Sequence, residues 1–448
     1  MPTMIDPSLH VFNLDDKYLA FEPITMHLFQ VDSDLPSKLT LSRRTLPDTA
    51  YIESSETSKN NEKARNLQIA ACKLSAAMQS LSSDRSPQLT TLWLNISHTC
   101  NMRCSYCFAD GGDYGKASNI MNEETAYQAI RFLFKDSTKG QIFRIVFFGG
   151  EPLTNYQVLK NSVLYAESMA DVNGVEVSFT LITNGTLINE EIVQFIKSHN
   201  FRIQFSLDGP EDINDRNRYF HKGQGSFESA YKGLILVKNA GITNIAVRPT
   251  ITHHNCNVTM LHQYMESIGF KMIAMIPVQA DNSSDYHLTK SDLNTIRLHY
   301  KKLALDMIAS MYAGKATDLG CFSPHVLQLL KGKRKRFYCG AGYNSLCVTP
   351  DGRLYPCHRF VSESEFEVGS VDREDFDLKG IGDLSVEDKA SCSKCWARYL
   401  CGGGCEAAAY AKNNDFHKPD ETLCEVTRAI IENALRIYYV IMYGEQQI

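Results

Sequence analysis

The chain has 448 residues, more than one typical domain holds, which predicts two or three domains with a sizeable core. Hydrophobic residues make up 44% of it and the formal net charge is −5, so the composition is globular and gives no reason to expect nucleic acid or an anionic membrane as a partner. No apolar run approaches the length of a membrane span and no signal-like leader opens the chain, so we expect a soluble, cytoplasmic protein.

The first segment, residues 1–86, is predicted to be a small α+β module. Short extended runs are expected at residues 10–12, 18–22 and 26–31. A polar stretch follows, and then a helical pattern of leucines and alanines between residues 67 and 81. Nothing in this module looks catalytic, so it either recognises a partner or only extends the core.

Residues 87–310 alternate between strand-like runs and helical patterns. The predicted strands are residues 91–96, 142–148, 175–183, 202–207, 244–251 and 272–277. Asn122 and Ser226 are predicted to start two of the helices. Crossover helices between strands predict an α/β fold with a parallel sheet, either curved into part of a barrel or open. In both cases the ligand site belongs at the carboxyl ends of the strands.

Three cysteines follow the first of these strands in a C-x3-C-x2-C array, at Cys100, Cys104 and Cys107. Three thiolates from one loop can bind three corners of a four-iron cluster and leave the fourth iron without a protein ligand. A zinc site is the alternative, but structural zinc sites usually have four ligands, and no fourth lies near this loop. The array therefore predicts a cluster with an open iron, where a cofactor can bind.

Glycine and polar residues follow several strands at their carboxyl ends. The Gly149-Gly150-Glu151-Pro152 motif has paired glycines that allow close backbone approach, and a carboxylate that can accept from an ammonium group. Asn184 and Ser206 follow the next two strands, and Arg218 comes a little later. Each alone is a turn signal. Their shared position behind the cysteine loop predicts one cofactor-binding site.

The cysteine array and the Gly149–Pro152 motif together resemble the radical S-adenosylmethionine (SAM) superfamily. The resemblance implies a partial (β/α)6 TIM barrel and a [4Fe-4S] cluster whose open iron binds the amino and carboxylate groups of SAM. It implies that Gly150 and Glu151 face the methionyl amino group and that Tyr106 lies near the adenine. Ser206 and Arg218 would serve the carboxylate or the ribose. Cleavage of the cofactor would give a 5′-deoxyadenosyl radical that abstracts hydrogen.

Helical spacing returns between residues 303 and 330, and residues 311–338 are predicted to be a helical linker with a basic end. That end is the run from Lys331 to Arg336. The basic run is either a solvated face or a surface for an acidic peptide or a docking electron donor.

The last segment, residues 339–448, is rich in cysteine. Its cysteines are Cys339, Cys347, Cys357, Cys392, Cys395, Cys401, Cys405 and Cys424. Two zinc sites of four thiolates would satisfy this number. The ordered pattern C-gap-G-x4-C, C-x2-C-x5-C-x3-C, gap, C instead resembles the SPASM extension of peptide-modifying radical SAM enzymes. The remaining three, Cys72, Cys256 and Cys321, are predicted to be inert buried thiols.

The SPASM resemblance implies two auxiliary [4Fe-4S] clusters, and so three clusters in all. The distal cluster would be held by Cys392, Cys395, Cys401 and Cys424, and the proximal cluster by Cys339, Cys357 and Cys405. If Cys347 is the fourth proximal ligand, both clusters are closed and relay electrons. If it is not, one iron is open to a substrate group. We expect the closed form, since the spacing of Cys347 suits a loop that returns to the same site.

The resemblance implies a maturase that abstracts hydrogen from a ribosomally synthesised peptide and installs a carbon-sulfur or carbon-carbon crosslink. Oxidation of a protein side chain, as in anaerobic sulfatase maturation, is an alternative, and a zinc-binding protein without chemistry is another. Sulfatase maturases carry an acidic residue after the cysteine that corresponds to Cys357, where this chain has His358, and the difference favours crosslinking. Expected partners are a precursor peptide, whose leader a winged-helix-like N-terminal module would bind, and a flavodoxin or ferredoxin.

Overall fold

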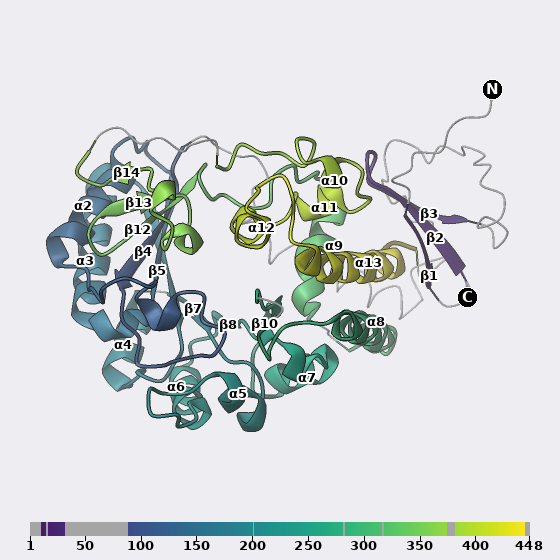
Figure 1. Ribbon diagram of the computed structural model, residues 1–448, viewed down its shortest axis with the longest axis horizontal. Coiled ribbons are helices and arrows are strands. Elements are labelled where there is room, and N and C mark those ends of the chain that lie inside the picture. Colours follow the sequence, from purple (N-terminus) through teal and green to yellow (C-terminus); the bar gives the residue numbers. More distant parts are fainter. Residues whose placement is uncertain are drawn as a thin grey trace.

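The computed structural model describes residues 10–14, 17–31, 88–199, 201–280, 283–315, 318–373 and 381–443. Within these ranges the main sheet has nine strands, and helices cover its outer face (Figure 1). The helix predicted at residues 67–81, and with it Cys72, lies outside the described residues.

Six parallel strands form the barrel part of the main sheet. In spatial order they are β4 (Thr91–Ser97), β5 (Ile142–Gly149), β6 (Glu176–Thr183), β7 (Arg202–Phe205), β8 (Ile245–Val247) and β10 (Met272–Ile273). The connecting helices are α2 (Glu123–Phe134), α3 (Tyr156–Asn173), α4 (Glu190–Ser198), α5 (Glu211–Asn217), α6 (Phe227–Asn239) and α7 (Val258–Ser267). Parallel pairing along this series confirms the predicted α/β fold, and the sheet curves as a partial barrel (Figure 1).

The last two predicted strands are each divided in two. After β8 and β10 the chain forms β9 (Thr250–Ile251) and β11 (Ile276–Pro277), which pair with each other in a separate two-stranded sheet. Pro249 lies at the first break, where it has no N–H to donate to a ladder, while its carbonyl accepts from Ile276. The strand predicted at residues 202–207 also ends early, at Phe205.

The two faces of the sheet carry different residues because side chains alternate along a strand. On β4, Leu92, Leu94 and Ile96 are fully buried in the core that the sheet shares with the outer helices. Trp93 belongs instead to a second hydrophobic cluster, with residues of the cysteine loop and of the C-terminal segment. The inner face of the barrel is therefore where the cysteine loop and the C-terminal segment meet.

Two helix starts predicted from the sequence are present, with different caps. The Asn122 side chain accepts from the Thr125 N–H and caps α2. Ser226 precedes α6 but makes no side-chain cap. Asp215 supplies the cap, since its Oδ1 accepts from the N–H groups of Ser226 (2.9 Å) and Phe227 (2.8 Å). A tertiary contact thus replaces the local capping that the sequence suggested.

Helical structure after the barrel begins earlier than predicted. Helix α8 (Lys290–Tyr312) starts at a capping box formed by Thr289 and Asp292. Helix α8 packs against the long C-terminal helix α13 (Glu421–Tyr443), and so does α9 (Ser323–Leu330). Helix α9 lies in the segment predicted to be a linker, so this part of that segment belongs to a packed core. None of the helices in the described ranges has both the length and the hydropathy needed to span a bilayer.

The C-terminal segment extends the barrel sheet. The strands β12 (Ser345–Val348) and β13 (Arg353–Tyr355) form an antiparallel hairpin, and Gly352 in its turn has a φ of +81°. Strand β12 pairs in parallel with β4, and β14 (Gly369–Ser370) ends the sheet. The segment continues with α10 (Ala390–Ser393), α11 (Arg398–Cys401) and α12 (Glu406–Asn413). Backbone pairing therefore fixes this segment beside the strand that leads into the cysteine loop.

The N-terminal strands form an antiparallel sheet that contacts α13. They are β1 (His10–Leu14), β2 (Lys17–Glu22) and β3 (His27–Val31), close to the predicted bounds (Figure 1). The His10 ring stacks on Trp396 with centroids 3.7 Å apart, and its Nε2 lies 3.0 Å from Glu432 Oε2. Arg436 Nε donates to the carbonyl of Asn13 at 3.0 Å. Polar and aromatic contacts thus join the two ends of the chain.

We predict that Glu432→Gln weakens this N-terminal contact. Burial favours the protonated carboxyl, but the hydrogen bond from His10 and the charge of Arg436 outweigh it and lower the pKa of Glu432 from 4.5 to about 2. A lowered carboxyl pKa contributes stability that is present above pH 4.5 and lost as the pH falls through 2. Because Glu432 is partly exposed, we expect a loss of about 1–3 kcal/mol at pH 7.

Urea unfolding at pH 7 and pH 3, followed by Trp396 fluorescence, measures this loss. The difference between wild type and Glu432→Gln should shrink at pH 3. The matched control is Glu191→Gln, since Glu191 is 66% exposed and lies 3.7 Å from Lys160. An equal effect of both substitutions would contradict the prediction.

Candidate active site

The cysteine loop leaves the carboxyl end of β4, where ligand sites of parallel α/β sheets lie. The thiols of Cys100, Cys104 and Cys107 are half-buried and close enough to interact electrostatically. Burial is the largest cause that raises the pKa of Cys100 to about 12 and that of Cys104 to about 11. Such thiols lose their protons when a metal cation replaces them.

The predicted glycine motif lies against the backbone of this loop. A Cβ on Gly150 would lie 2.2 Å from the carbonyl oxygen of Thr99, the residue before Cys100. Gly149 has a φ of +136°, and a Cβ there would meet the carbonyl oxygen of Ser97 at 2.2 Å. Glu151 N–H donates to the Thr99 carbonyl at 2.9 Å. Both glycines are required because the end of β5 and the cysteine loop touch through their backbones.

Glu151 joins two neighbouring strand ends. Its carboxylate is 1% exposed and accepts from the Asn184 N–H at 2.7 Å, from Thr183 Oγ1 at 2.8 Å and from the Leu153 N–H at 3.1 Å. Burial raises the pKa of Glu151 to about 7, and these donors only partly offset it. The contact of Glu151 with an ammonium group remains a prediction, since its oxygens already accept from the protein.

Asn184, at the end of β6, also reaches the cysteine loop. Its Nδ2 donates to Asn101 Oδ1 at 2.9 Å and lies 3.9 Å from Cys100 Sγ. Ser206 lies one strand further along, and its N–H donates to the Thr183 carbonyl at 2.9 Å. The structure thus brings the residues predicted at three successive strand ends to one edge of the sheet.

Tyr106, Asp208 and Arg218 form a buried chain of hydrogen bonds beside the cysteines. The Tyr106 hydroxyl donates to Asp208 Oδ2 and accepts from Arg218 Nη1 at 3.0 Å. The charge of Arg218 acts on Cys104. Tyr106 and Arg218 were predicted from the sequence, whereas Asp208 was not. Its position directly after a strand was the signal that could have identified it.

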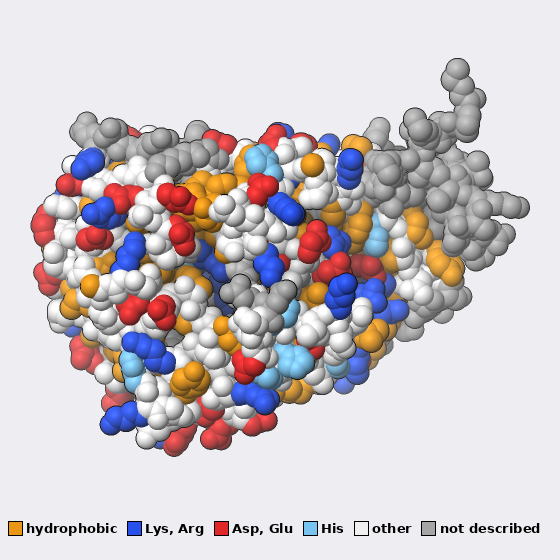
Figure 2. All heavy atoms as spheres, viewed as in Figure 1, with side chains coloured by type: hydrophobic (Ala, Val, Ile, Leu, Met, Phe, Trp, Pro, Cys, Tyr) orange, Lys and Arg blue, Asp and Glu red, His pale blue; other side chains and the backbone are white. Residues whose placement is uncertain are grey.

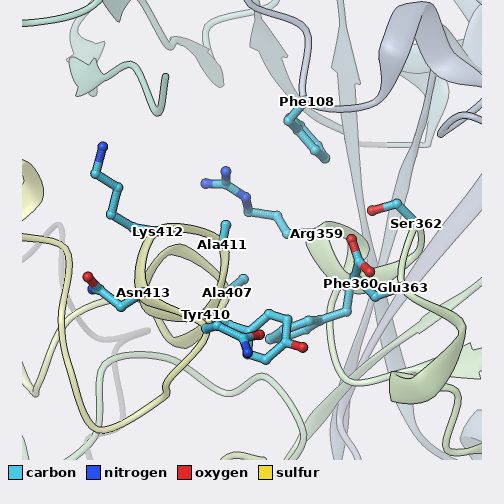
Figure 3. Close-up of a pocket in the computed structure, with 11 residues that line it drawn as sticks. Phe108, Arg359, Phe360, Ser362, Glu363, Ala407, Tyr410, Ala411, Lys412 and Asn413 are labelled. Atoms are coloured by element: carbon cyan, nitrogen blue, oxygen red, sulfur yellow. The ribbon is translucent and has the colours of Figure 1, made fainter. Parts of the chain in front are cut away.

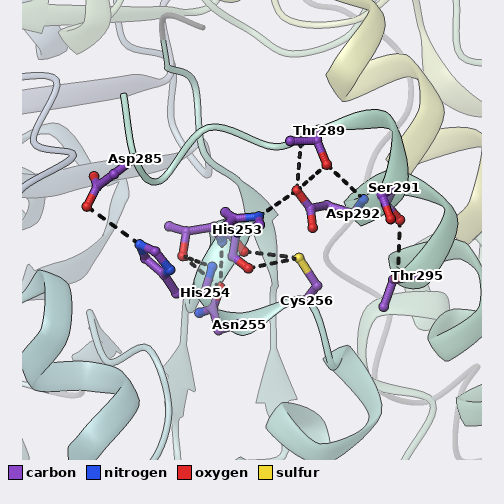
Figure 4. A network of polar contacts seen from close by, with 10 residues as sticks. His253, His254, Asn255, Cys256, Asp285, Thr289, Ser291, Asp292 and Thr295 are labelled. Carbon is purple, nitrogen blue, oxygen red and sulfur yellow. Dashed lines mark hydrogen bonds and ion pairs between the residues drawn. The ribbon is translucent and has the colours of Figure 1, made fainter. Parts of the chain in front are cut away.

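A polar network anchors the loop that passes beside Tyr106 (Figure 4). Tyr286 in this loop meets the Tyr106 ring edge-on at 6.5 Å, and its carbonyl accepts from the His253 N–H at 3.1 Å. His253 Nδ1 lies 2.9 Å from Asp292 Oδ2 at the start of α8. The nearby Cys256 is half-buried, and burial followed by the charge of Asp292 raises its pKa to about 12, as expected for an inert thiol.

The C-terminal cysteines fall into two groups whose members interact electrostatically. One group contains Cys392, Cys395, Cys401 and Cys424. The other contains Cys339, Cys357 and Cys405. Cys347 lies on β12 and is fully buried, and Cys357 is the thiol that acts on it. Between two of these cysteines, residues 402–404 are three successive glycines with positive φ, so the backbone turns tightly there.

The donor set is chemically suited to iron–sulfur clusters, whose protein ligands are cysteine thiolates. Within the described ranges, no group of three or more His, Cys, Asp or Glu side chains is placed to hold a single metal ion. The thiols within each of the three cysteine groups act on one another electrostatically, so they are neighbours.

The basic run before Cys339 lies against both C-terminal cysteine groups. Lys335 is half-buried, and burial lowers its pKa, while the thiols of Cys401 and Cys339 act in the opposite direction. Arg336 forms an ion pair with Glu387, with Nε 3.1 Å from Oε1. The run is therefore partly built into the protein, rather than wholly a solvated face.

A cavity of about 630 Å³ opens between the cysteine loop and the C-terminal segment (Figure 3). Phe108 lines it from the cysteine loop, Arg359 from the segment after Cys357, and Lys412 from α12. Figure 2 shows this face hollowed between the barrel and the C-terminal segment, with Lys or Arg side chains deep in the hollow. The sequence reasoning missed Phe108 and Arg359, although each is adjacent in sequence to a residue that it singled out, Cys107 and His358.

Aromatic rings form the inner wall beside this cavity. His358 stacks on Trp93 with centroids 4.4 Å apart and lies 4.6 Å from Phe148 and 5.8 Å from Phe108. Burial, followed by the charges of Arg359 and Arg248, lowers the pKa of His358 well below its usual value. The imidazole is therefore neutral near pH 7 and packs as part of an aromatic surface.

Residues 94–260 match the family model described as the radical SAM superfamily. The matched residues run from β4 to α7 and contain the cysteine loop, the Gly149–Pro152 motif and Arg218. The resemblance seen in the sequence is thereby confirmed.

Two curated relatives illustrate the range of similar proteins. The cysteine-type anaerobic sulfatase-maturating enzyme of Clostridium novyi is 23% identical over 375 residues, covering 79% of this chain and 97% of that protein. The radical SAM cyclopropyl synthase TigE of Paramaledivibacter caminithermalis is 22% identical over 376 residues, covering 78% of this chain and 74% of that protein.

Two solved structures share the fold. Native anSMEcpe with bound AdoMet aligns with a TM-score of 0.67 at 22% identity, covering 79% of this chain and 99% of that chain. Streptococcus suis SuiB bound to the precursor peptide SuiA aligns with a TM-score of 0.52 at 14% identity, covering 94% of this chain and 99% of that chain. At these identities the alignments establish the fold alone.

Proposed function

This chain is a radical SAM enzyme, homologous to anaerobic sulfatase-maturating enzymes and to a radical SAM cyclopropyl synthase, and from that premise we propose that it crosslinks a ribosomally synthesised peptide. Hydrogen would be abstracted from one residue of the peptide, and a carbon-sulfur (thioether) or carbon-carbon bond would follow. When bound, the cluster and SAM supply the 5′-deoxyadenosyl radical for this abstraction. The protein's part is to bind and orient both substrates.

We assign the cofactor site to the edge of the sheet around the cysteine loop. Its proposed residues are Cys100, Cys104 and Cys107 for the cluster, and Tyr106, Gly149, Gly150, Glu151, Asn184, Ser206 and Arg218 for SAM. The backbone contact of Gly150 with Thr99 and the reach of Asn184 to Asn101 support this assignment. Arg218 keeps a positive charge beside Cys104, where it can face a carboxylate.

We propose two auxiliary [4Fe-4S] clusters in the C-terminal segment, three clusters in all. The proposed distal ligands are Cys392, Cys395, Cys401 and Cys424, and the proposed proximal ligands are Cys339, Cys347, Cys357 and Cys405. The electrostatic grouping of these thiols supports the division. With four ligands each, the clusters would relay electrons, with a flavodoxin or ferredoxin as the external donor.

The aromatic wall around His358 is the observation that favours crosslinking over side-chain oxidation. A sulfatase maturase carries an acidic residue at this position, whereas His358 is half-buried, neutral and stacked on Trp93. A stacked neutral ring offers a surface against which a peptide side chain can pack, and it replaces a carboxylate that could accept a proton. Side-chain oxidation remains the second candidate, because the relative from Clostridium novyi carries that name.

The N-terminal sheet would bind the leader of the precursor peptide. The alignment with SuiB, a structure that contains a precursor peptide, spans 94% of this chain, whereas the anSMEcpe alignment spans 79%. The outer strands of the sheet, β1 and β3, each pair with β2 alone within the described residues. An extended peptide can add to such an edge.

Anaerobic reconstitution tests the proposal. We expect about twelve irons per chain, from three four-iron clusters, and cleavage of SAM to 5′-deoxyadenosine. Mass spectrometry of the peptide encoded beside the gene should show a loss of two hydrogens and a link that survives proteolysis and thiol alkylation. An aldehyde at Cys or Ser would favour side-chain oxidation instead, and zinc without iron or SAM cleavage would refute both.

We further predict that Cys347→Ala alters the proximal cluster alone. If this thiol is the fourth ligand, its loss leaves one iron of that cluster without a protein ligand and changes the electron paramagnetic resonance signal of the reduced protein. Iron content should fall from about twelve towards about eight per chain if the cluster is lost. Cys321→Ala is the control, since burial raises the pKa of Cys321 to about 12 and no cluster is assigned to it. Unchanged spectra and iron content would remove Cys347 from the ligands.

A further inference from the structure

The guanidinium of Arg359 stands in the cavity between the cysteine loop and α12. Its carbon lies 5.1 Å from the centroid of the Phe108 ring, and its Nη2 donates to Gln279 Oε1. Figure 3 shows the guanidinium directed into the cavity toward the side of α12 and away from Glu363, which comes from the same segment as Arg359. The Phe108 ring contacts the flat face of the Arg359 guanidinium, and the Gln279 amide oxygen accepts from one of its edges. These two contacts together fix the orientation of the planar group.

Gln279 supports Arg359 from one side. Its Oε1 accepts from Arg359 Nη2, and Gln279 is not among the residues that line the cavity. The Arg359 guanidinium is therefore the group that faces an occupant of the cavity, while the amide fixes its position.

A second arginine, Arg248, makes the region strongly positive. The groups that act on Arg248 most strongly are the Arg359 guanidinium, the Tyr338 hydroxyl and the thiols of Cys405 and Cys357, none of which is a carboxylate. Burial and the charge of Arg359 lower the pKa of Arg248. Arg248 faces the proposed proximal cluster ligands, which become anionic when they bind iron. Arg359 lines the cavity, and its charge also acts on the Cys357 thiol.

We propose that this cavity binds a carboxylate side chain, Asp or Glu, of the substrate peptide through Arg359, which Gln279 holds in position. The inference rests on the proposed function, because it takes the occupant of the cavity to be a peptide. A carboxylate accepts hydrogen bonds and donates none, so it matches the guanidinium fork. The aromatic rings beside the guanidinium lower the local polarity and strengthen the charge pairing. Arg359 is thus a specificity-determining residue.

Binding of degenerate peptides to the reconstituted protein tests this proposal. Fluorescein-labelled nonapeptides carry a fixed central Asp, Glu, Asn or Gln and random residues elsewhere, and fluorescence anisotropy measures the dissociation constants under anaerobic conditions. For wild type we expect the acidic libraries to bind about 10- to 100-fold more tightly than the amide libraries, as charge-assisted hydrogen bonds predict. This preference should fall below about threefold in Arg359→Met.

Variants separate specific recognition from loss of structure. Arg131→Met is the matched control, because Arg131 pairs with Glu124 on the outer helix α2, and it should keep the full preference. Arg359→Lys keeps the charge but loses the fork, so an intermediate preference is expected. Gln279→Met removes the amide oxygen that holds the Arg359 guanidinium in position, and it serves if Arg359→Met fails to fold. The Arg359 backbone N–H, which donates to Cys357 Sγ at 3.3 Å, is retained in every variant.

Equal binding of acidic and amide libraries by wild type would overturn the proposal, as would an unchanged preference in both Arg359→Met and Gln279→Met. Peptide modification, measured in parallel, distinguishes this failure from failure of the proposed function. A crosslinked precursor with no acidic preference would refute the carboxylate site alone. An acidic preference without any peptide modification would refute the crosslinking function and leave the carboxylate site standing.

Discussion

Cys104→Ala is expected to abolish SAM cleavage and to lower the iron content from about twelve to about eight atoms per chain. Cys104 is the middle one of three thiols in one loop. The proposed cluster needs a thiolate on three of its four irons, and the two thiolates that remain in the variant cannot hold it. The half-buried loop offers no other cysteine as a substitute, because the neighbouring groups belong to the C-terminal segment. We expect formation of 5′-deoxyadenosine to fall by more than about 1000-fold.

Chromatographic measurement of 5′-deoxyadenosine and colorimetric iron analysis check this result. The control is Cys256→Ala, because the Cys256 thiol donates to the Thr252 carbonyl at 3.2 Å and belongs to none of the proposed clusters. That variant should keep wild-type iron and activity. Retention of iron and SAM cleavage in Cys104→Ala would contradict the assignment of the first cluster.

Gly150→Ala is expected to disable the cofactor site through a backbone clash. The added Cβ would lie 2.2 Å from the carbonyl oxygen of Thr99 and 2.6 Å from its carbonyl carbon. Backbone atoms cannot yield as the end of a flexible side chain does, so the cysteine loop must shift. We expect the free energy of unfolding to fall by roughly 1–3 kcal/mol, and SAM cleavage to fall by about 100-fold because a displacement near 1 Å misplaces the reacting groups.

Calorimetric titration with SAM and assay of 5′-deoxyadenosine measure the effect. Gly140→Ala is the control, since no heavy atom lies within 4 Å of a Cβ built there, although its φ is +83°. Gly140→Ala should lower the free energy of unfolding by about 1 kcal/mol, because alanine is strained at a positive φ. It should leave SAM cleavage unchanged. If Gly140→Ala impaired cleavage as much as Gly150→Ala, the clash with the cysteine loop would not be the cause.

Much of the barrel could be predicted because its signals are local. Strand runs such as residues 91–96 and the helix that begins after Asn122 lie close to their predicted positions. Each depends on side-chain alternation, a cap or a backbone conformation that neighbouring residues determine. The superfamily could also be predicted from the sequence, because the cysteine spacing and the Gly149–Pro152 motif are short patterns, each contained in a single loop.

Errors arose at three element ends, for two different reasons. Asp215 caps α6 in place of Ser226, which is a tertiary contact that the local sequence does not announce. The other two signals are local: α8 begins at Lys290 after the Thr289–Asp292 capping box, and the strand predicted at residues 244–251 breaks at Pro249, which cannot donate to a ladder. Hydrophobic spacing alone overlooked them.

The sequence alone determined the superfamily of this protein, because the proposed ligands of the first cluster lie within eight residues, Cys100 to Cys107, and the glycine motif is continuous. Only the tertiary structure decided what surrounds that chemistry. Arg359 meets Phe108 across more than two hundred residues and Gln279 across 80. Asp208 contacts Tyr106 across 102 residues, and His10 stacks on Trp396 near the other end of the chain. Such contacts depend on how strands and helices pack, and packing brings together residues whose separation in sequence carries no signal.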